Sequence, residues 1–425
     1  MPSDDDENLD LVSSQQQVDS LNREFYGRFP YPWPPQSFPM ISDRRLERTM
    51  LNQSIGGWNN DIIPPDADIW VAGCGTNQAI YTALKFPDAA IVASDISVSS
   101  LEISRKTAAA LGLTNIAFRQ ESLNEVGYEA RFDYVICTGV IHHNADPAVP
   151  LARLSKALKP RGVLELMVYN RFHRLMTSAV QKTVRVFSRA AGREADFGAE
   201  FRIAKAIIDA GPLPPFVRED FKDSPDARFA DSWLQPVEHS YSVESLSQLA
   251  ASCDLRLLAP CLTHFDYANA VLSWDTAFDD PALQTQYDAL SDLDRWQVAN
   301  LLLGGRSPML WFYLCREGTD RPQDLERTLC GQFLDLRFER VHTSVRNYVR
   351  DNDGGYALNP APMPYPRTPQ NPLIGKVLER ADPSRRMGDI LREIGVDTAS
   401  RRAVNEIRMQ TTSPLCPYLK VADGA

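Results

Sequence analysis

Two glycines separated by one residue, Gly73 and Gly75, directly follow the largely apolar run 68–72. A second apolar run, 90–93, is followed shortly by the acidic residue Asp95. Glycines at this position leave room for a ligand to lie against the backbone, and they allow a tight turn. A carboxylate about twenty residues further along the chain accepts hydrogen bonds from ribose hydroxyls. The spacing therefore predicts the opening of a nucleotide-binding βαβ unit.

The residue that follows the glycine turn narrows the choice of nucleotide. The dinucleotide fingerprint is G-x-G-x-x-G, and this chain has Gln78 where the third glycine would stand. A pyrophosphate also needs close backbone approach at a helix N-terminus, which this loop supplies less well. A ligand without phosphates, such as S-adenosylmethionine, fits better than NAD, although the two glycines alone do not decide.

Further strand and helix patterns alternate along the chain after this unit. We expect strands at 115–119, 132–137 and 163–168, with a helix at 150–158. This alternation indicates a parallel sheet covered on both faces, and such sheets bind ligands at the carboxyl ends of their strands. Four candidate binding residues stand at such ends: Gly73, Asp95, Ser122 and Thr138.

Over roughly residues 65 to 170 the chain resembles the class I S-adenosylmethionine-dependent methyltransferases. The resemblance is carried by the motifs at 71–77, 95–97, 132–135, 139–143 with Asp146-Pro147, and 158–162. It implies an α/β fold with a Rossmann-like, doubly wound sheet of seven strands. The run 309–314 would be the last, antiparallel strand. The resemblance also implies S-adenosylmethionine as the cofactor.

Positions in the family's motifs suggest how the cofactor would be held. Gly73 and Gly75 would flank its methionine part, and Asp95 would hold the ribose rather than merely cap the helix that follows. The residues expected to bind the cofactor are Gly73, Cys74, Gly75, Asn77, Gln78, Asp95, Ile96, Ser122, Leu123, Thr138 and Gly139.

The same family motifs suggest which residues lie at the adenine end of the cofactor and which lie near its methyl group. Ile96 would pack on the adenine. Ser122 and Leu123 would lie at the adenine edge, where the family often has an acidic residue. Thr138 and Gly139 would lie near the transferring methyl group.

Three side chains are candidates for a catalytic base: His142, His143 and Tyr26. Adjacent histidines point in different directions on regular backbone, so joint metal ligation is awkward and we predict no metal. A structural role near the cofactor competes with catalysis for both histidines. A buried aromatic residue of the core is an equally good interpretation of Tyr26.

Four further residues are candidates for contact with the substrate: Tyr31, Tyr169, Arg171 and His173. The last three follow the fifth strand, at the ligand end of the sheet. The alternatives are a core aromatic for Tyr31 and a solvated helix start for the others. The basic stripe that continues to Arg193 is most simply a solvated helix face.

Composition bounds the class of protein. The chain has 425 residues and a formal net charge of −10, which argues against nucleic acid as the main partner. No apolar run approaches the roughly 18 residues needed to span a membrane, and no signal peptide is evident. Seven cysteines without C-x-x-C spacing indicate reduced thiols in a cytoplasmic protein. No oligomeric state is predicted.

The chain divides into four parts on this reading. We expect a disordered tail (1–20), an aromatic and proline-rich lid segment (21–64), a methyltransferase domain (65–316) with a helical insertion (171–240), and a small C-terminal accessory region (317–425).

The resemblance makes methyl transfer to a small molecule or peptide the leading function, through an oxygen, nitrogen or carbon nucleophile. A non-catalytic scaffold or regulatory subunit that binds the cofactor is the main alternative. A nicotinamide oxidoreductase is the third, and Gln78 argues against it.

Overall fold

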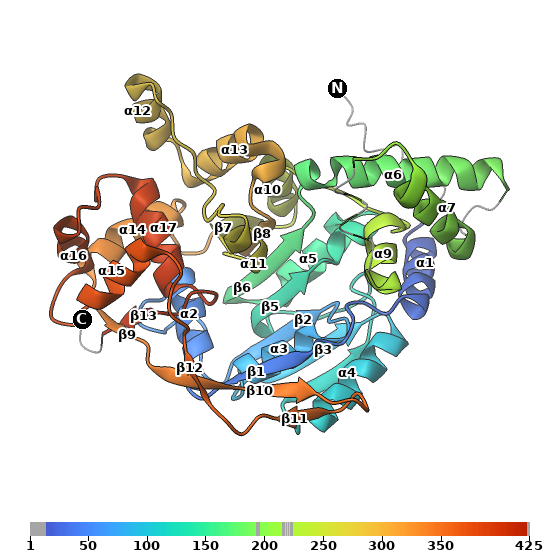
Figure 1. Cartoon of the computed structure of the whole chain (residues 1–425), viewed down its shortest axis with the longest axis horizontal. Helices are drawn as coiled ribbons and strands as arrows, with labels where there is room; N and C mark the ends of the chain where they lie inside the picture. The colour runs from blue at the N-terminus through green and yellow to red at the C-terminus, as the bar shows by residue number, and fades with distance from the viewer. Residues whose placement is uncertain are drawn as a thin grey trace.

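A seven-stranded sheet forms the centre of the computed structural model, which describes residues 14–192, 196–214, 217, 219, 221 and 224–422 (Figure 1). In spatial order its strands are β4 (Ile116–Gln120), β3 (Ala90–Asp95), β2 (Asp68–Ala72), β5 (Phe132–Thr138), β6 (Leu158–Val168), β8 (Leu310–Arg316) and β7 (Leu255–Pro260). The strands from β4 to β6 are parallel, and β8 is antiparallel to both of its neighbours. The predicted doubly wound sheet and its antiparallel last strand are confirmed.

Side chains alternate between the two faces of the sheet, and each face has its own core. In β2, Ile69 and Val71 belong to one hydrophobic cluster, whereas Trp70 and Ala72 belong to the other. The first face is covered by α2 (Leu46–Ser54), α3 (Gln78–Lys85), α4 (Val98–Ala110), α14 (Leu325–Asp335), α15 (Pro372–Arg380), α16 (Met387–Glu393) and α17 (Arg401–Thr412). The second face is covered by α5 (Ala148–Ala157), α10 (Val243–Ser252) and α13 (Asp292–Leu303). Strand periodicity thus separates the two layers of helices.

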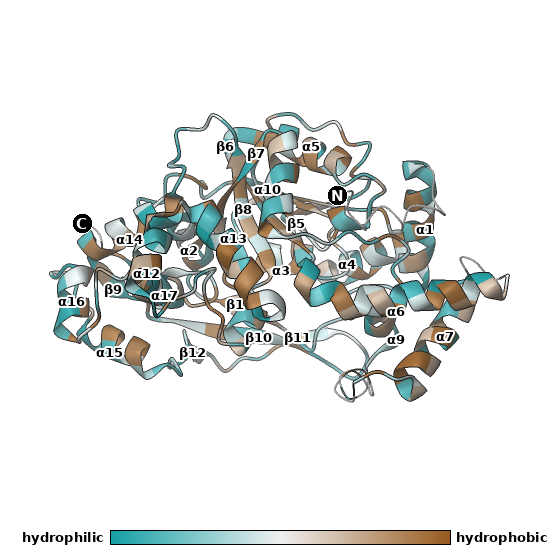
Figure 2. Ribbon diagram, turned by 90° about the horizontal axis from the view of Figure 1, so that it is seen from above, coloured by the Kyte–Doolittle hydropathy of each residue, from teal (hydrophilic) through white to brown (hydrophobic). Residues whose placement is uncertain are grey.

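A helical insertion lies between β6 and α10. Its described helices are α6 (Arg171–Ala190), α7 (Phe197–Ala210) and α9 (Asp226–Trp233). They pack with the N-terminal helix α1 (Gln15–Arg28) around Phe25, Val184, Phe197 and Phe229. Figures 1 and 2 show α6 and α7 extending together at one end of the molecule. The basic stripe expected along α6 ends in Arg193, which lies outside the described residues.

Segments from the two ends of the chain pair in a second sheet. Its strands are β1 (Ser37–Ile41), β10 (Thr343–Arg350), β11 (Tyr356–Leu358) and β12 (Met363–Tyr365). β1 and β10 are antiparallel, and Phe38 lies opposite Tyr348. β9 (Phe338–Arg340) pairs with β13 (Leu419–Val421). The remaining described elements are α11 (His264–Ala268), α12 (Pro281–Ala289) and the 3₁₀ turns η2 (Ile141–His143) and η3 (Gly304–Arg306).

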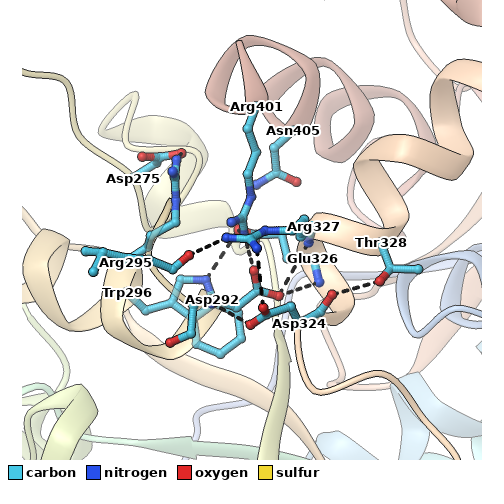
Figure 3. Close-up of polar contacts among 12 residues, drawn as sticks. Asp275, Asp292, Arg295, Trp296, Asp324, Glu326, Arg327, Thr328, Arg401 and Asn405 are labelled. Atoms are coloured by element: carbon cyan, nitrogen blue, oxygen red, sulfur yellow. Dashed lines mark hydrogen bonds and ion pairs between the residues drawn. The ribbon is translucent and has the colours of Figure 1, made fainter. Parts of the chain in front are cut away.

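Buried ion pairs connect the region after residue 316 to a helix that covers the sheet. Arg401 of α17 forms ion pairs with Asp292 of α13 and with Glu326 of α14, the latter at 3.4 Å (Figure 3). The backbone N–H of Glu326 also donates to Asp292 Oδ2 at 2.7 Å. The side chains of Asp292 and Glu326 are each only 2% exposed. Removal of Arg401 would therefore leave two buried carboxylates without their cation, a change that is strongly destabilising.

The end of the expected disordered tail is in fact the first part of α1. Residues 1–13 lie outside the described residues, and α1 begins at Gln15. Ser14 caps the helix in a capping box with Gln17, and Val18 is fully buried. The cap and the buried apolar side chain together stabilise this turn, although its composition is polar.

None of the helices in the described part of the chain is both long and apolar enough to cross a membrane.

Candidate functional site

A cavity of about 480 Å³ opens at the carboxyl ends of β2, β3, β5 and β6. This volume lies in the range of about 300–1,000 Å³ that small-molecule sites typically have. All the residues expected to bind the cofactor line it, namely Gly73, Cys74, Gly75, Asn77, Gln78, Asp95, Ile96, Ser122, Leu123, Thr138 and Gly139. Residues from four strand ends thus meet in one place.

The two glycines of the turn are required by close contacts as well as by backbone conformation. Gly73 has φ +69°, and a Cβ atom there would lie 2.5 Å from Val140. Gly75 has φ +53°, and its Cβ atom would lie 2.9 Å from the carbonyl oxygen of Tyr31. A left-handed backbone and the lack of space each exclude a larger residue.

Asp95 is held by backbone donors at the end of β3. Its Oδ2 accepts from the N–H of Gly75 and its Oδ1 from the N–H of Ser97, both at 2.8 Å. Ser97, not Asp95, is the N-cap of α4, because its hydroxyl accepts from the N–H of Ser100. Burial raises the pKa of Asp95, and these backbone hydrogen bonds offset part of the increase. Each carboxylate oxygen keeps a lone pair for a ligand hydroxyl.

The aromatic and proline-rich segment is attached directly to the glycine turn. The Thr76 hydroxyl donates to the carbonyl of Pro32, and Asn77 Nδ2 donates to the carbonyl of Trp33 at 3.0 Å. Tyr31 and Pro32 line the cavity. Asn77 therefore gives the turn a side-chain link that a glycine at this position would not supply.

The N-terminal helix contributes an acidic residue beside Ser122. Asp19 Oδ2 accepts from the Ser122 hydroxyl at 2.6 Å, and Asp19 Oδ1 accepts from Asn124 Nδ2 at 3.1 Å. Asp19 and Glu121 both line the cavity. The sequence reasoning missed Asp19 because it lies in the expected disordered tail. It also missed Glu121, although its acidic side chain next to Ser122 was a usable signal.

Tyr26 lies beside two polar residues that the sequence reasoning did not identify. Gln235 Nε2 donates to the Tyr26 hydroxyl at 2.7 Å and to Asp231 Oδ1 at 3.0 Å. Burial raises the pKa of Asp231 to about 6 and raises that of Tyr26 well above its ordinary value. Tyr26 and Asp231 line the cavity. At neutral pH the tyrosine is protonated and the aspartate is ionised.

The two adjacent histidines occupy different environments. His143 lines the cavity, and its Nδ1 lies 2.9 Å from the carbonyl of Val237, so Nδ1 carries the proton. Burial lowers the pKa of His143 to about 4. His142 is fully buried outside the cavity lining, and its ring centroid lies 4.0 Å from that of Tyr169. Neither His142 ring nitrogen has a hydrogen-bond partner among the described residues.

Only two of the four candidates for substrate contact lie at the cavity. Tyr31 and Tyr169 line the cavity, whereas Arg171 and His173 do not. His173 Nε2 instead lies 2.8 Å from the carbonyl oxygen of Ser307, which is not part of the cavity lining. Among the described residues no cluster of three or more potential metal ligands was found.

Part of the basic stripe on α6 faces inward. Arg174 makes two hydrogen bonds to Glu238, at 2.7 and 2.6 Å, and its guanidinium lies 4.2 Å from the centroid of the Tyr169 ring. Arg185 Nη2 donates to the carbonyl of Gln235 at 2.7 Å. These arginines therefore fix the loop 234–238 behind the cavity instead of forming a solvated face.

Comparisons with known proteins agree with this geometry. A family model described as a methyltransferase domain matches residues 72–192. An uncharacterized protein from Synechococcus sp. is 30% identical over 44% of this chain and 46% of its own length. A ubiquinone biosynthesis O-methyltransferase from Leptothrix cholodnii is 25% identical over 33% of this chain and 58% of its own. The chain thus spans less than two thirds of the length of these relatives.

A solved structure shows that the fold is shared beyond this domain. PKMT2 from Rickettsia typhi, in complex with AdoHcy, is 15% identical, with a TM-score of 0.54 over 92% of this chain and 78% of that protein. At this identity the likeness concerns the fold alone. Together with the family model, it confirms the class I methyltransferase fold that the motifs predicted.

Proposed function

We propose that this chain is an S-adenosylmethionine-dependent methyltransferase that acts on a nucleophile of a small molecule or peptide. The observation that carries the proposal is the meeting of Gly73, Gly75 and Asp95 with residues from two further strand ends in one cavity. The methyltransferase-domain match over residues 72–192 supports it. The bound AdoHcy of the Rickettsia typhi protein, which has the same fold, supports the choice of cofactor.

The proposed placement of the cofactor follows the strand ends. The ribose lies against Asp95, whose carboxylate is already oriented by two backbone N–H groups. The adenine lies towards Ile96 and Ser122, and the methionine part lies along the glycine turn. Thr138 and Gly139 then lie close to the methyl group. Preorientation of this kind lowers the entropic cost of binding.

In this proposal the chain contributes mainly binding and alignment. The sulfonium of the cofactor supplies an activated methyl group, so the protein has to bring the acceptor into line with it and exclude water. Tyr31 and Tyr169 line the cavity and would contact the acceptor. The enclosing aromatic side chains also lower the local polarity around the reacting atoms.

Asp231 is the best-placed candidate for a base. Its pKa of about 6 leaves it ionised at neutral pH, and it lines the same cavity as Tyr26. Tyr26 remains protonated and would orient the acceptor through its hydroxyl. His143 has a free lone pair on Nε2, but its pKa of about 4 makes it a weak base. The acceptor atom is an oxygen, a nitrogen or a carbon, and an acceptor that has to lose a proton would lose it to this base.

Calorimetry with S-adenosylhomocysteine, followed by a transfer assay, tests the proposal. We expect micromolar binding, and labelled methyl transfer from S-adenosylmethionine into the small-molecule or peptide fraction of a cell extract. Binding without transfer in any fraction would favour the non-catalytic scaffold. Thermal stabilisation by NADH but not by S-adenosylhomocysteine would favour the oxidoreductase.

The state of the cysteines supports a reducing compartment for this reaction. All seven are free thiols, and six of them are buried. We therefore place the reaction in the cytoplasm, where thiols remain reduced.

A further inference from the structure

A second cavity, of about 800 Å³, lies on the first face of the sheet. Strands β5, β6 and β8 form its floor, and α2 and α3 form one side. Residues of the segments 365–367 and 408–418 also line it. The accessory region after residue 316 therefore supplies part of the wall of this cavity.

The second cavity adjoins the proposed cofactor site. Gln78, Tyr81 and Met309 line both cavities. Gln78 is the first residue of α3, directly after the glycine turn that would hold the methionine part of the cofactor. A ligand in the second cavity would thus lie next to the end of the cofactor that carries the methyl group.

A carboxylate projects from the floor of the second cavity. Glu165 of β6 accepts hydrogen bonds from the Trp311 indole N–H at 2.9 Å and from the Tyr134 hydroxyl. Both partners are neutral, so the positive charge that acts on Glu165 comes from Lys85, which partly offsets the effect of burial on the Glu165 pKa. Each of its oxygens also retains a lone pair for a further donor.

The nearest cation does not balance the acidic groups. Lys85 lies 3.0 Å from Glu47, and both line the cavity with Glu165. One ammonium thus faces two carboxylates. Burial raises the pKa of Glu165, which is the expected response of a carboxyl group with too little compensating charge.

The other cations on the lining are directed elsewhere. Arg408 Nη2 donates to Asn405 Oδ1 at 2.7 Å, and Arg44 pairs with Asp88 at 2.5 Å. Arg367 is exposed at the rim. The floor strands themselves contribute the carboxylate of Glu165 and no cation to the lining, whereas Arg408, which is bonded to the neutral Asn405, brings a positive charge from the accessory-region wall.

Aromatic rings dominate the lining around this carboxylate. The cavity is lined by Tyr81, Phe86, Tyr134, Phe265, Trp311, Tyr313, Tyr365 and Tyr418. Aromatic faces attract organic cations, and such rings together with a carboxylate are the usual means of holding them. An anionic ligand would meet repulsion from the floor, and a purely apolar one would leave the carboxylate desolvated without a partner.

We infer that the second cavity binds the cationic part of the methyl acceptor, a small organic cation with an aromatic or apolar body, whose positive group is seated on Glu165 and whose reactive atom extends into the cofactor cavity beside Tyr31, Tyr169 and Asp231. This inference rests on the proposed methyltransferase function. It assigns the accessory region the task of closing the acceptor site. The reactive atom of the acceptor would reach the cofactor past Gln78 and Met309.

Calorimetric titration of the full chain, saturated with S-adenosylhomocysteine, tests the inference with benzamidine and tyramine as probes. We expect at least one of them to bind, and the uncharged counterparts benzamide and 4-ethylphenol to bind at least tenfold more weakly. Glu165→Gln should weaken binding of the cationic probe at least tenfold. Glu317→Gln, an exposed carboxylate outside the cavity, should not change it.

A second variant shows whether the probe binds in this cavity without altering Glu165, whose substitution could also impair folding. Leu415→Trp adds bulk to the lining from the accessory region without a change in the floor. It should abolish probe binding but leave the affinity for S-adenosylhomocysteine unchanged. Failure of both cationic probes to bind, equal binding of their neutral counterparts, or unchanged binding by Glu165→Gln would overturn the inference. If the wild-type protein does not bind S-adenosylhomocysteine, that result counts against the proposed function instead.

Discussion

The backbone N–H of Gly75 donates to the carboxylate of Asp95 at 2.8 Å. The two residues belong to different strand ends, and the hydrogen bond joins the glycine turn to the proposed ribose-binding group. The turn and the carboxylate therefore form one preorganised unit. A ligand that binds both gains affinity because neither has to be ordered on binding.

Asp95→Ala should weaken S-adenosylhomocysteine binding at least 100-fold. Two charge-assisted hydrogen bonds to the ribose would be lost, each worth about 1.5–3 kcal/mol. Calorimetry measures the change. Asp279→Ala removes an exposed carboxylate outside the cavity and is the control. An affinity within threefold of wild type for Asp95→Ala would rule out its proposed role.

Gly75→Ala should reduce cofactor affinity through a clash with the lid segment. The added Cβ atom would meet the Tyr31 carbonyl at 2.9 Å, which forces the segment away from the turn. Gly112 also has positive φ, +66°, but a Cβ atom there would meet nothing within 4 Å. Both alanine variants should lose about 1–2 kcal/mol of stability from backbone strain. Only Gly75→Ala should lose S-adenosylhomocysteine affinity; equal losses would show that the contact is unimportant.

The stability of the protein should depend on the ionisation of Asp231. Its pKa is about 6 in the folded state, against about 3.9 when unfolded. The folded state therefore binds the proton more tightly, and stability falls as pH rises from about 4 to 6. The ionised carboxylate costs roughly 2–3 kcal/mol above this window. Urea unfolding should give a lower free energy of unfolding at pH 7.5 than at pH 5 for the wild type. Asp231→Asn should not show this pH-dependent fall.

The same group should control the rate if it acts as the base. The turnover number should rise with pH through about 6 and level off above it, because only the ionised form accepts a proton. Asp231→Asn should lower turnover about 10²-fold or more and remove this limb of the profile. A profile unchanged by the substitution would exclude Asp231 as the base.

Glu238→Gln should destabilise the fold strongly. The side chain of Glu238 is 2% exposed, and it pairs with Arg174, which is 14% exposed. Neutralisation leaves a largely buried guanidinium without a counter-charge, a change that typically costs about 3–5 kcal/mol. Asp389→Asn removes one partner of an exposed pair with Arg392 and should cost less than about 1 kcal/mol. Urea unfolding of the two variants compares the costs directly.

The sheet and the residues that meet in the first cavity could be predicted because their signals are local. The apolar runs of β2 and β3 have strand periodicity, and the Gly73–Asp95 spacing reflects the length of a single βαβ unit. The carboxyl ends of neighbouring parallel strands meet at one edge of the sheet. Residues at those ends therefore share a site whatever the other contacts of the chain are.

Long-range contacts account for what could not be predicted. Asp19 reaches the cavity from a helix that precedes the methyltransferase domain, and Asp231 reaches it from the helical insertion within that domain; neither has a local motif. The pairing of β1 with β10 joins residues about 300 positions apart. Adjacent histidines at 142 and 143 gave no indication that a 3₁₀ turn would direct only one of them into the cavity.

The wall formed by α1 and the Tyr31–Pro32 segment has a consequence for turnover. Asp19, Asn22 and Tyr26 of this wall line the cofactor cavity, and Thr76 and Asn77 attach the segment to the turn. Under the proposed function, every contact that this wall makes with the cofactor would have to be broken again when the demethylated product departs. Tight binding of the cofactor and rapid exchange of the product would therefore oppose each other at this wall.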